Sequence, residues 1–405
     1  MHVYLYSKFF PVAPAPIRDG IVKAMHGLAA GFVANDTTTT ILSEGPQAAT
    51  TRTDAGYVHH CFKTRYPGQS WHLSPDLQQF IQTHITDRDL VILNGGFHLS
   101  VYALARFLLQ RGIPYIVAPH IAYDPPMFQK SPYLKYPYWH LLERRLLQHA
   151  AAIQVLDQRQ AIHLQQRRIH TPIVAVPNGF DRHELMPCPP RTPDNRISDN
   201  RIPDNCIPDN CTIKLLFFGR LSLAIKGLDL LLQAFAQLPR SPDTPNLRLT
   251  LQGHDAGDLK SLQQLSHQLG LRDEVEFLPP DYHTPASTLM GNYDIICLPS
   301  RSEGFGLSAL EAMLAGRPVM VSSVAGIAPY VEASGGGIVV SPDAQSIQAG
   351  LQFLFKSREQ WSEMGQNGRQ YAIDNLSWPT IAQTALAAYR ELFNRPQDQT
   401  VIASH

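Results

Sequence analysis

The sequence has no long apolar run, few cysteines and no net charge, and each absence excludes a class of protein. No stretch of about 18 apolar residues is present, so no segment is predicted to span a membrane. Lys and Arg together number 34, as do Asp and Glu, so no basic excess indicates binding to nucleic acid. The five cysteines are scattered and form no C-x-x-C pair, which is typical of reduced cysteines in a cytosolic protein.

Length and composition indicate two globular domains. A chain of 405 residues is too long for a single ordinary core. Its 44% hydrophobic and 17% charged residues are typical of a soluble protein. Residues 1–7 lack the charged and apolar segments of a signal peptide, so we expect them to form the first strand of the fold.

Short apolar runs alternate with helical patterns along most of the chain. Over residues 1–185 the patterns predict strands at 90–93, 115–118 and 153–156 and helices at 99–109 and 141–152. From residue 213 they predict strands at 214–218, 247–251, 275–278, 294–298, 318–321 and 337–340, and a last helix from Trp378. This order predicts two α/β domains, residues 1–185 and 213–376, each with a parallel sheet.

A five-residue repeat rich in Pro, Asp and Asn occupies residues 192–211 and reads TPDNR, ISDNR, IPDNC, IPDNC. Proline at this spacing prevents a regular helix or a central strand. We interpret residues 186–212 as an interdomain linker. A metal site at Cys206 and Cys211 is the less favoured alternative.

The run from Glu303 to Leu307, followed by Glu311, is the pattern most informative about chemistry. It joins a buried strand to a helix, which is where the backbone N–H groups of α/β proteins bind anions. Gly304 and Gly306 allow the backbone to approach a ligand closely. Two carboxylates around an anion-binding turn suit a ligand with both phosphates and hydroxyls, such as a nucleotide sugar.

Arg220 and Lys226 follow the first strand of the second domain and suit a phosphate clamp. Arg220 offers a planar fork, and Lys226 a mobile point charge at the start of a helix. Taken alone, such residues are more often solvated surface groups. Their presence with Glu303 and Glu311 at the ends of parallel strands favours the clamp.

The chain resembles the family 4 glycosyltransferases in residues 176–181, 219–221, 226–227, 303–307 and 311–312. The resemblance implies the GT-B fold, an α/β fold of two Rossmann-like parallel-sheet domains that face a cleft. It implies retaining transfer of a sugar from a nucleotide-diphosphate sugar to a hydroxyl of a glycan or lipid-linked acceptor, in cell-envelope polysaccharide or glycolipid synthesis. The donor would bind the second domain. A C-terminal helix at residues 377–395 would pack back on the first, acceptor domain.

Carried over residue by residue, the resemblance assigns a donor site. Arg220 and Lys226 would bind the diphosphate and stabilise the departing nucleotide, so both would act in catalysis. Glu311 would hold the ribose hydroxyls, and Glu303 would contact the hydroxyls of the donor sugar as a further catalytic residue. The donor would also be lined by Gly219, Gly304, Phe305, Gly306 and Leu307.

In the first domain the resemblance points to His120 and Gly20. His120 ends a strand and would face the donor sugar as a catalytic residue, whereas the alternative is a turn histidine that meets water or caps a helix. His98 is a second candidate, but a helix begins there and the histidine can simply cap it. Gly20 would lie near the donor phosphates, although the family carries two adjacent glycines where this chain has Asp19 and Gly20.

Two features of the reaction follow, its route and its independence of metal. Retention allows a covalent carboxylate intermediate or attack on the face from which the leaving group departs. The sequence offers no obvious carboxylate near His120, Asp124 being the nearest, so we expect same-face attack. Residues 87–89 spell a metal-binding D-x-D, but they precede a strand as a polar turn. Because Arg220 and Lys226 supply the positive charge, no metal cofactor is expected.

A basic and aromatic stretch in the first domain is relevant to where in the cell the protein acts. Residues 130–145 interleave Lys and Arg with Tyr and Trp, which suits contact with an anionic membrane surface and a lipid-linked acceptor. The favoured alternative is an amphipathic helix whose aromatic side chains pack inward. We expect a cytoplasmic protein, with peripheral contact at the inner face of the membrane as the second expectation.

Three other functions stay open to test. A nucleotide-sugar epimerase or hydrolase could use the same fold, and a measured product separates these from a transferase. A non-catalytic nucleotide-sugar-binding protein is disfavoured by the intact set of Arg220, Lys226, Glu303 and Glu311. A nicotinamide-dependent dehydrogenase would need G-x-G-x-x-G after its first strand, and neither domain has it.

Overall fold

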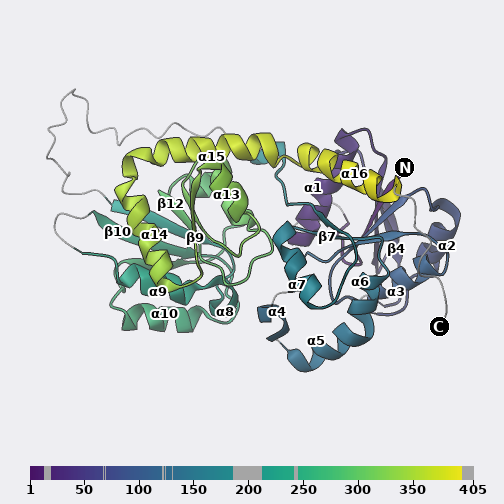
Figure 1. Ribbon diagram of the computed structural model, residues 1–405, viewed down its shortest axis with the longest axis horizontal. Coiled ribbons are helices and arrows are strands. Elements are labelled where there is room, and N and C mark those ends of the chain that lie inside the picture. The colour runs from purple at the N-terminus through teal and green to yellow at the C-terminus, as the bar shows by residue number, and fades with distance from the viewer. Residues whose placement is uncertain are drawn as a thin grey trace. The chain divides into compact units, whose positions relative to one another are not determined.

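The computed structural model describes residues 1–12, 20–66, 68, 70–120, 123, 125–129, 131–185, 212–240 and 245–394. The chain forms two compact units (Figure 1). Unit 1 contains Met1–Gly179 and the chain from Trp378, and unit 2 contains Phe180–Ser377. The repeat at residues 192–211, with both of its cysteines, lies outside the described residues.

Unit 1 is built around one sheet of eight described strands in the order β3-β4-β2-β1-β5-β6-β7-β8. The strands are β1 Val3–Tyr6, β2 Thr39–Gly45, β3 Ala49–Arg52, β4 Val58–Lys63, β5 Leu90–Asn94, β6 Tyr115–Ala118, β7 Ala152–Val155 and β8 Ile173–Ala175. β1, β5, β6 and β7 are buried along their whole length, which explains their mainly apolar sequences. β3 pairs antiparallel with β4 at one edge, and the other described pairs are parallel.

Two helices of unit 1 that are far apart in the sequence lie side by side, α1 Gly20–Ala34 and α16 Trp378–Asn394 (Figure 1). Glycines make this close packing possible. A Cβ at Gly27 would lie 1.9 Å from Nε1 of Trp378, and one at Gly31 would lie 2.4 Å from the carbonyl oxygen of Trp378. The remaining described helices of unit 1 are α2 Pro75–His84, α3 Leu99–Leu109, α4 Pro125–Gln129, α5 Pro132–Tyr138, η1 Trp139–Glu143, α6 Arg144–Gln148, η2 Gln158–Gln160 and α7 Ala161–Gln166.

The helix predicted at residues 141–152 is wrong in its bounds. The chain forms the π-helical turn η1, continues as α6, and leaves the helix after Gln148. β7 then begins at Ala152. Ala150 and Ala151, between the helix and the strand, are apolar like the residues of β7, so periodicity alone could not place the boundary.

Unit 2 is built around a parallel sheet of six described strands in the order β11-β10-β9-β12-β13-β14. All six strands predicted for this domain are present, as β9 Thr212–Phe218, β10 Asn246–Gln252, β11 Val275–Leu278, β12 Ile295–Leu298, β13 Val319–Ser322 and β14 Gly337–Val340. Numbered from β9, the order is 3-2-1-4-5-6, that of a doubly wound sheet. The direction of the order reverses between β9 and β12.

The helices of unit 2 bury apolar stripes against this sheet. In α9 Leu228–Ala236 the buried positions Leu228, Leu231, Leu232 and Phe235 recur every three or four residues, as in an amphipathic helix. The other described helices are η3 Arg182–Glu184, α8 Leu223–Lys226, α10 Leu259–Gln268, α11 Ala286–Met290, α12 Leu307–Leu314, α13 Ala328–Ser334, α14 Ala344–Lys356, η4 Arg358–Gln360 and α15 Trp361–Asn375.

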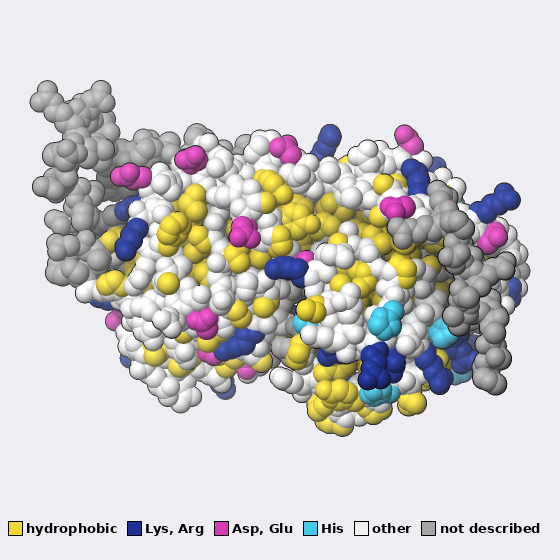
Figure 2. Space-filling model, viewed as in Figure 1, with side chains coloured by type: hydrophobic (Ala, Val, Ile, Leu, Met, Phe, Trp, Pro, Cys, Tyr) yellow, Lys and Arg dark blue, Asp and Glu magenta, His cyan; other side chains and the backbone are white. Residues whose placement is uncertain are grey.

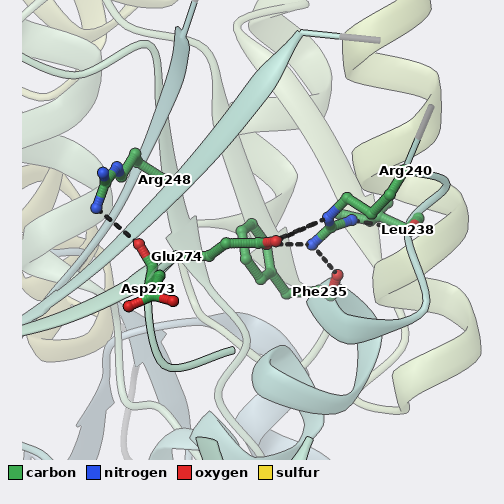
Figure 3. A network of polar contacts seen from close by, with 6 residues as sticks. All are labelled: Phe235, Leu238, Arg240, Arg248, Asp273 and Glu274. Carbon is green, nitrogen blue, oxygen red and sulfur yellow. Dashed lines mark hydrogen bonds and ion pairs between the residues drawn. The ribbon is translucent and has the colours of Figure 1, made fainter. Parts of the chain in front are cut away.

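A polar network ties the end of α9 to the start of β11 (Figure 3). The guanidinium of Arg240 donates to Oε2 of Glu274 at 2.6 Å. It also donates to the carbonyl oxygens of Leu238 and Phe235, at 2.8 and 3.0 Å. Glu274 directly precedes β11, so the network lies at the amino end of that strand. Ligands of parallel sheets bind at the opposite, carboxyl ends, which makes this network a structural feature.

Candidate functional site

The loops after β9 and β12 carry the predicted donor residues, and the fold brings these loops together. β9 and β12 are neighbours in the sheet, at the place where the strand order reverses. Gly219 and Arg220 directly follow β9, and Glu303 lies between β12 and α12. Ligands of open parallel sheets bind at such a reversal, beyond the carboxyl ends of the strands.

An ion pair joins the two loops. Nζ of Lys226, at the end of α8, pairs with Oε2 of Glu303. Oγ of Ser300, a fully buried residue, donates to the same oxygen at 3.2 Å. The side chains of Lys226 and Glu303 are 14% and 16% exposed, so the pair is largely removed from solvent. The sequence pointed to both residues but gave no sign that they touch.

Arg301 holds the same two loops together. Its guanidinium donates to both carboxylate oxygens of Asp229 in α9, at 2.6 and 2.7 Å, and to the carbonyl oxygen of Leu223 at 2.9 Å. The backbone N–H of Arg301 donates to the carbonyl oxygen of Ile225 at 2.8 Å. Hydrogen bonding to Asp229 raises the pKa of the Arg301 guanidinium, so this charge is permanent. The segment before Glu303 is therefore fixed to the segment before Lys226.

Two glycines allow these segments to approach each other. Gly227 has φ of +62°, and a Cβ there would lie 2.3 Å from the carbonyl oxygen of Pro299. Gly306 has φ of +107°, and a Cβ there would lie 2.8 Å from Cδ2 of Leu298. Both residues need the left-handed backbone that glycine adopts without strain. Gly306 is thus required by the packing beneath the loop, apart from any ligand above it.

The other predicted donor residues surround this junction in sequence. Arg220 is exposed, and Gly219 before it is in close contact with Gly253, where a Cβ would lie 1.8 Å from the carbonyl oxygen of Gly219. Glu311 is half-buried in the second turn of α12, on the helix face of Leu307. Leu307 begins α12, so its N–H is among the first-turn groups that a helix leaves without an internal partner.

Phe305 contributes to the fold through its ring and can face a ligand only through its backbone. The residue is 2% exposed, and its ring packs edge-on against Tyr330 with the centroids 6.1 Å apart. The carbonyl oxygen of Phe305 accepts from the N–H of Ile327 at 2.8 Å. These contacts anchor the middle of the predicted glycine loop.

The D-x-D at residues 87–89 forms a turn before β5, as the sequence predicts. Asp89 accepts from N and Oγ1 of Thr86 at 2.9 Å each, and from N of His2 at 3.1 Å. Within the described part of the chain, no group of three or more His, Cys, Asp or Glu side chains is placed to hold a metal ion.

In unit 1, His120 contacts Asn94. Nε2 of His120, just after β6, lies 2.8 Å from Oδ1 of Asn94, the last residue of β5. Nδ2 of Asn94 donates to the carbonyl oxygens of Tyr6 and Ile92 at 3.3 and 3.2 Å, which fixes the orientation of the amide. Oδ1 therefore accepts, and Nε2 of His120 carries the hydrogen. The contact sets the tautomer of the neutral ring and leaves Nδ1 as its acceptor.

The other candidates of unit 1 are less well defined. Gly20 is the first residue of α1, and residues 13–19 before it, which complete the predicted phosphate loop, lie outside the described residues. Asp124 lies outside them too. His98 precedes α3 but makes no side-chain capping bond to it, and its ring packs edge-on against Phe9 at 6.2 Å. His98 thus occupies the N-cap position of α3, where the helix was expected to begin, without a capping bond from its side chain.

α5 and the turn after it carry an exposed aromatic and apolar surface. Tyr133 is 75% exposed, Leu134 64%, Tyr136 50% and Leu141 62%. Figure 2 shows hydrophobic side chains gathered over α5, with Lys, Arg and His side chains beside them. The expectation that the aromatics pack inward holds for Trp139, which is buried, and is wrong for Tyr133 and Tyr136. None of the helices described is both long and apolar enough to cross a membrane.

The residues that join the loops of the site were not predictable as site residues from the sequence. Asn94, Asp229 and Arg301 belong to no motif that the sequence displays, and their partners are distant in the chain. A weak signal was present in two cases. Asn94 is a polar residue at the end of a buried apolar strand, and Arg301 stands two residues before Glu303.

Two family models match the chain. Residues 19–179 match the model described as Glycosyl transferase 4-like domain, and residues 207–371 match Glycosyl transferases group 1. Over 191 residues the chain is 34% identical to a D-inositol 3-phosphate glycosyltransferase of Corynebacterium urealyticum, covering 45% of this chain and 44% of that protein. Over 178 residues it is 33% identical to an uncharacterised glycosyltransferase of Methanocaldococcus jannaschii, covering 44% of each. The chain thus spans less than half the length of these curated relatives.

Solved structures match over almost the whole chain. Sucrose-phosphate synthase of Thermosynechococcus elongatus gives a TM-score of 0.71 at 18% identity, covering 96% of this chain and 98% of that one. HepE of Anabaena, solved with UDP, gives a TM-score of 0.67 at 18% identity, covering 96% and 100%. These neighbours are GT-B glycosyltransferases, so the predicted fold class, two parallel-sheet α/β domains of the GT-B type, is confirmed.

Proposed function

The chain belongs to the family 4 type of glycosyltransferases, and on that premise we propose that it moves a sugar from a nucleotide-diphosphate sugar to a hydroxyl of a glycan or lipid-linked acceptor. The observation that carries the proposal is the junction of the loops after β9 and β12, where Lys226 pairs with Glu303 at the reversal of the strand order. HepE, solved with UDP and with UDP-glucose, supports a nucleotide sugar as the donor. We also place the reaction in cell-envelope polysaccharide or glycolipid synthesis.

The donor binds unit 2 in this proposal. Arg220 is exposed and can turn its planar fork toward the diphosphate. Lys226 keeps its bond to Glu303 and still has two N–H donors for phosphate oxygens, since an ammonium carries three. Glu303 accepts from hydroxyls of the donor sugar, and Glu311 from hydroxyls of the ribose. The first N–H groups of α12, from Leu307, face the diphosphate.

The reaction we propose is same-face substitution at the anomeric carbon. The bond from that carbon to the diphosphate oxygen breaks, and a bond to the acceptor oxygen forms on the same face. The proton of the acceptor hydroxyl passes to the departing phosphate oxygen, so no protein carboxylate becomes covalently attached. Negative charge grows on the leaving diphosphate, and Arg220 and Lys226 stabilise it. The sugar therefore keeps its anomeric configuration.

We propose that the transfer needs no metal cofactor. Two positive charges, on Arg220 and Lys226, follow β9 and serve the diphosphate directly. Addition of EDTA should therefore leave the rate of transfer unchanged. A loss of activity that Mg²⁺ or Mn²⁺ restores would contradict this part of the proposal.

His120 is the residue of unit 1 that we assign to the transfer step. Its position after β6 and its bond to Asn94 support a fixed ring with a defined tautomer. A turn histidine that only meets water would need no such partner. Changes at His120 should therefore lower turnover of the bound donor and leave the affinity of unit 2 for the nucleotide unchanged.

We also propose contact of unit 1 with an anionic membrane surface at the cytoplasmic face. A bilayer suits this surface because Tyr133, Leu134 and Leu141 are exposed. The basic Arg145, in the following helix, is exposed as well. Aromatic and apolar side chains with flanking cations suit the interface of an anionic bilayer. Flotation with phosphatidylglycerol vesicles should recover the protein, and Tyr133→Ser with Leu134→Ser should abolish the recovery. Equal recovery with neutral vesicles would contradict the electrostatic part.

A product assay tests the reaction itself. The protein is incubated with UDP-, GDP-, ADP- and CMP-sugars and with extracted lipid and glycan acceptors, and products are identified by mass spectrometry and NMR. A new glycoside with the anomeric configuration of the donor supports the proposal. An inverted product would overturn retention. Epimerised donor or free sugar as the sole product would favour an epimerase or hydrolase, and binding without any turnover would favour a non-catalytic protein.

A further inference from the structure

Glu143 is a fully buried carboxyl group in unit 1 that the proposed reaction does not use. It ends the π-helical turn η1, a kind of turn frequent at functional sites. Oε1 accepts from the N–H of Phe97 at 3.0 Å and from the hydroxyl of Tyr123 at 2.6 Å. Oε2 has no hydrogen-bond partner among the residues described. Burying a carboxyl group costs free energy, so the presence of Glu143 at this buried position requires an explanation.

The two partners of Glu143 stand on the segments that carry the His120–Asn94 contact. Phe97 follows β5, which ends at Asn94, and Tyr123 follows β6 and His120. The N–H of Gly95 also donates to the carbonyl oxygen of Ala118, at 2.9 Å. The ends of β5 and β6 are thus linked twice. His120 bonds directly to Asn94, and the Glu143 carboxylate bonds to both Phe97 and Tyr123.

The backbone of these segments is strained. The described part of the chain has six residues other than glycine with positive φ. Three of them are Phe97, His120 and Tyr123, at +59°, +57° and +51°. Histidine enters this region more readily than most residues, but bulky aromatic residues such as Phe97 and Tyr123 do so only where the surroundings impose it, and such strain gathers at functional sites. Two of the three strained residues are held by Glu143, and the third is the candidate histidine.

We propose that Glu143 is a positioning residue, which holds the strained segments after β5 and β6 in the conformation that presents His120 to the reaction. This inference rests on the proposed function, because it assumes that His120 takes part in transfer. Glu143 acts only through Phe97 and Tyr123 and touches no substrate.

The chemistry of the carboxyl group agrees with this role. Burial raises the pKa of Glu143 to about 7, and the hydrogen bonds from Tyr123 and Phe97 oppose that rise without cancelling it. Tyr123 and Tyr138 are the titratable groups that interact with the Glu143 carboxyl, and the buried hydroxyl of Tyr138 has no hydrogen-bond partner in the described structure. Oε1 accepts in both protonation states, so the amide oxygen of glutamine can replace it.

The test compares Glu143→Ala with Glu143→Gln. Alanine removes both bonds and should lower kcat by about 10- to 100-fold, the usual effect of a small misplacement, with unchanged affinity for the nucleoside diphosphate. Glutamine keeps the acceptor oxygen and should retain kcat within about threefold of the parent protein. Tyr123→Phe removes one bond only and should give an intermediate loss. This milder variant keeps the test decisive if Glu143→Ala does not fold.

Glu44→Ala is the matched control. Glu44 is 5% exposed and also accepts from a tyrosine hydroxyl and a backbone N–H, those of Tyr6 and Ser74, each at 2.8 Å. It is the next-to-last residue of β2, and no predicted site residue directly follows that strand. Glu44→Ala should lower thermal stability as Glu143→Ala does and keep the kcat of the folded protein. Equal kcat losses in both alanine variants, or a Glu143→Gln variant as slow as Glu143→Ala, would overturn the proposal.

A second readout is independent of turnover. The ¹H and ¹⁵N signals of the His120 ring report its hydrogen bond to Asn94, and Glu143→Ala should shift them whereas Glu143→Gln and Glu44→Ala should not. Unshifted His120 signals in Glu143→Ala would overturn the positioning role. A parent protein that transfers no sugar from any donor would instead remove the proposed function and leave this readout decisive for Glu143.

Discussion

At the scale of single residues, the Lys226–Glu303 pair changes how the donor site is understood. The sequence suggested that Lys226 binds phosphate and that Glu303 binds the sugar, and the structure places these two side chains in direct contact. Glu303 therefore orients the ammonium group and is in turn held by Ser300. A carboxylate in this position opposes binding of a phosphate. In the proposed donor site it would also give the sugar hydroxyls an acceptor fixed beside the positive charge.

Glu303→Gln is the variant that separates these two effects. We expect kcat to fall about 100-fold, since a preorganised charge at the reacting centre is lost. The affinity for the nucleoside diphosphate should stay equal or rise, because a negative charge next to the phosphates is removed. Glu311→Gln should act mainly on binding: it should weaken nucleotide binding by about tenfold and change kcat less than Glu303→Gln does. Steady-state kinetics and calorimetric titration measure both, and a Glu303→Gln variant that only weakens nucleotide binding would contradict the account.

The sequence points to candidate site residues in unit 2 but does not predict how they meet. Arg220, Lys226, Glu303 and Glu311 are recognisable because each lies in or just beyond a connection from a predictable strand to a helix. The contact of Asn94 with His120 could not be foreseen, because it depends on the order of strands in the sheet. Local patterns contain no information on that order.

At the scale of elements, two arginine–carboxylate pairs in the described part of unit 2 lie at opposite ends of its sheet. Arg301 with Asp229 lies beyond the carboxyl ends of the strands and fixes the loop of Glu303. Arg240 with Glu274 lies at the amino end of β11 (Figure 3). The two pairs have similar chemistry and exposure, so they form a natural comparison between a functional and a structural role.

Arg301→Ala and Arg240→Ala should lower the free energy of unfolding by similar amounts but differ in their effect on kcat. Each variant loses one partly exposed pair, which contributes about 0.2 to 1 kcal/mol to the free energy of unfolding. Arg301→Ala should also lower kcat by about tenfold or more, because the loop of Glu303 is no longer fixed. Arg240→Ala should keep kcat. Thermal unfolding and kinetics on the same samples decide, and equal kcat values in the two variants would refute the positioning role of Arg301.

The elements themselves were partly predictable. The strands of unit 2 are mainly apolar runs between clear turns, and all six were found at or within two residues of their predicted places. In unit 1 the sequence gave no sign of β3, an antiparallel edge strand of alternating exposure, or of the π-helical turn before Arg144. Edge strands bury few side chains, and a π turn depends on the packing of its neighbours, so neither leaves a periodic apolar pattern.

At the scale of the whole molecule, the two units are separate compact bodies with their own sheets. Unit 1 contains a buried histidine that makes its stability depend on pH. Nε2 of His59 lies 2.7 Å from Oγ of Ser43, and the residue is 3% exposed. Burial, assisted by the neighbouring His60, lowers the pKa of His59 to about 4. The folded protein therefore keeps this ring neutral where the unfolded chain protonates it.

The sign of the effect follows from linkage. Between pH 6.5 and 4 the unfolded state binds a proton at His59 that the folded state does not, so stability falls as the pH falls through this range. His59→Gln, which cannot be protonated, should show a shallower fall than the parent protein. Chemical denaturation at pH 7.5, 6, 5 and 4 measures both slopes. Parallel curves for the two proteins would show that His59 does not contribute.

The central claim is that the junction of the loops after β9 and β12 binds a nucleotide sugar without metal. It is tested most directly by calorimetric titration with UDP-, GDP-, ADP- and CMP-sugars, with and without EDTA. The account predicts that one nucleotide class binds, that EDTA changes nothing, and that Arg220→Ala weakens binding by about 10- to 100-fold whereas Arg240→Ala does not. No binding of any nucleotide sugar, or equal binding by Arg220→Ala and the parent protein, would contradict it.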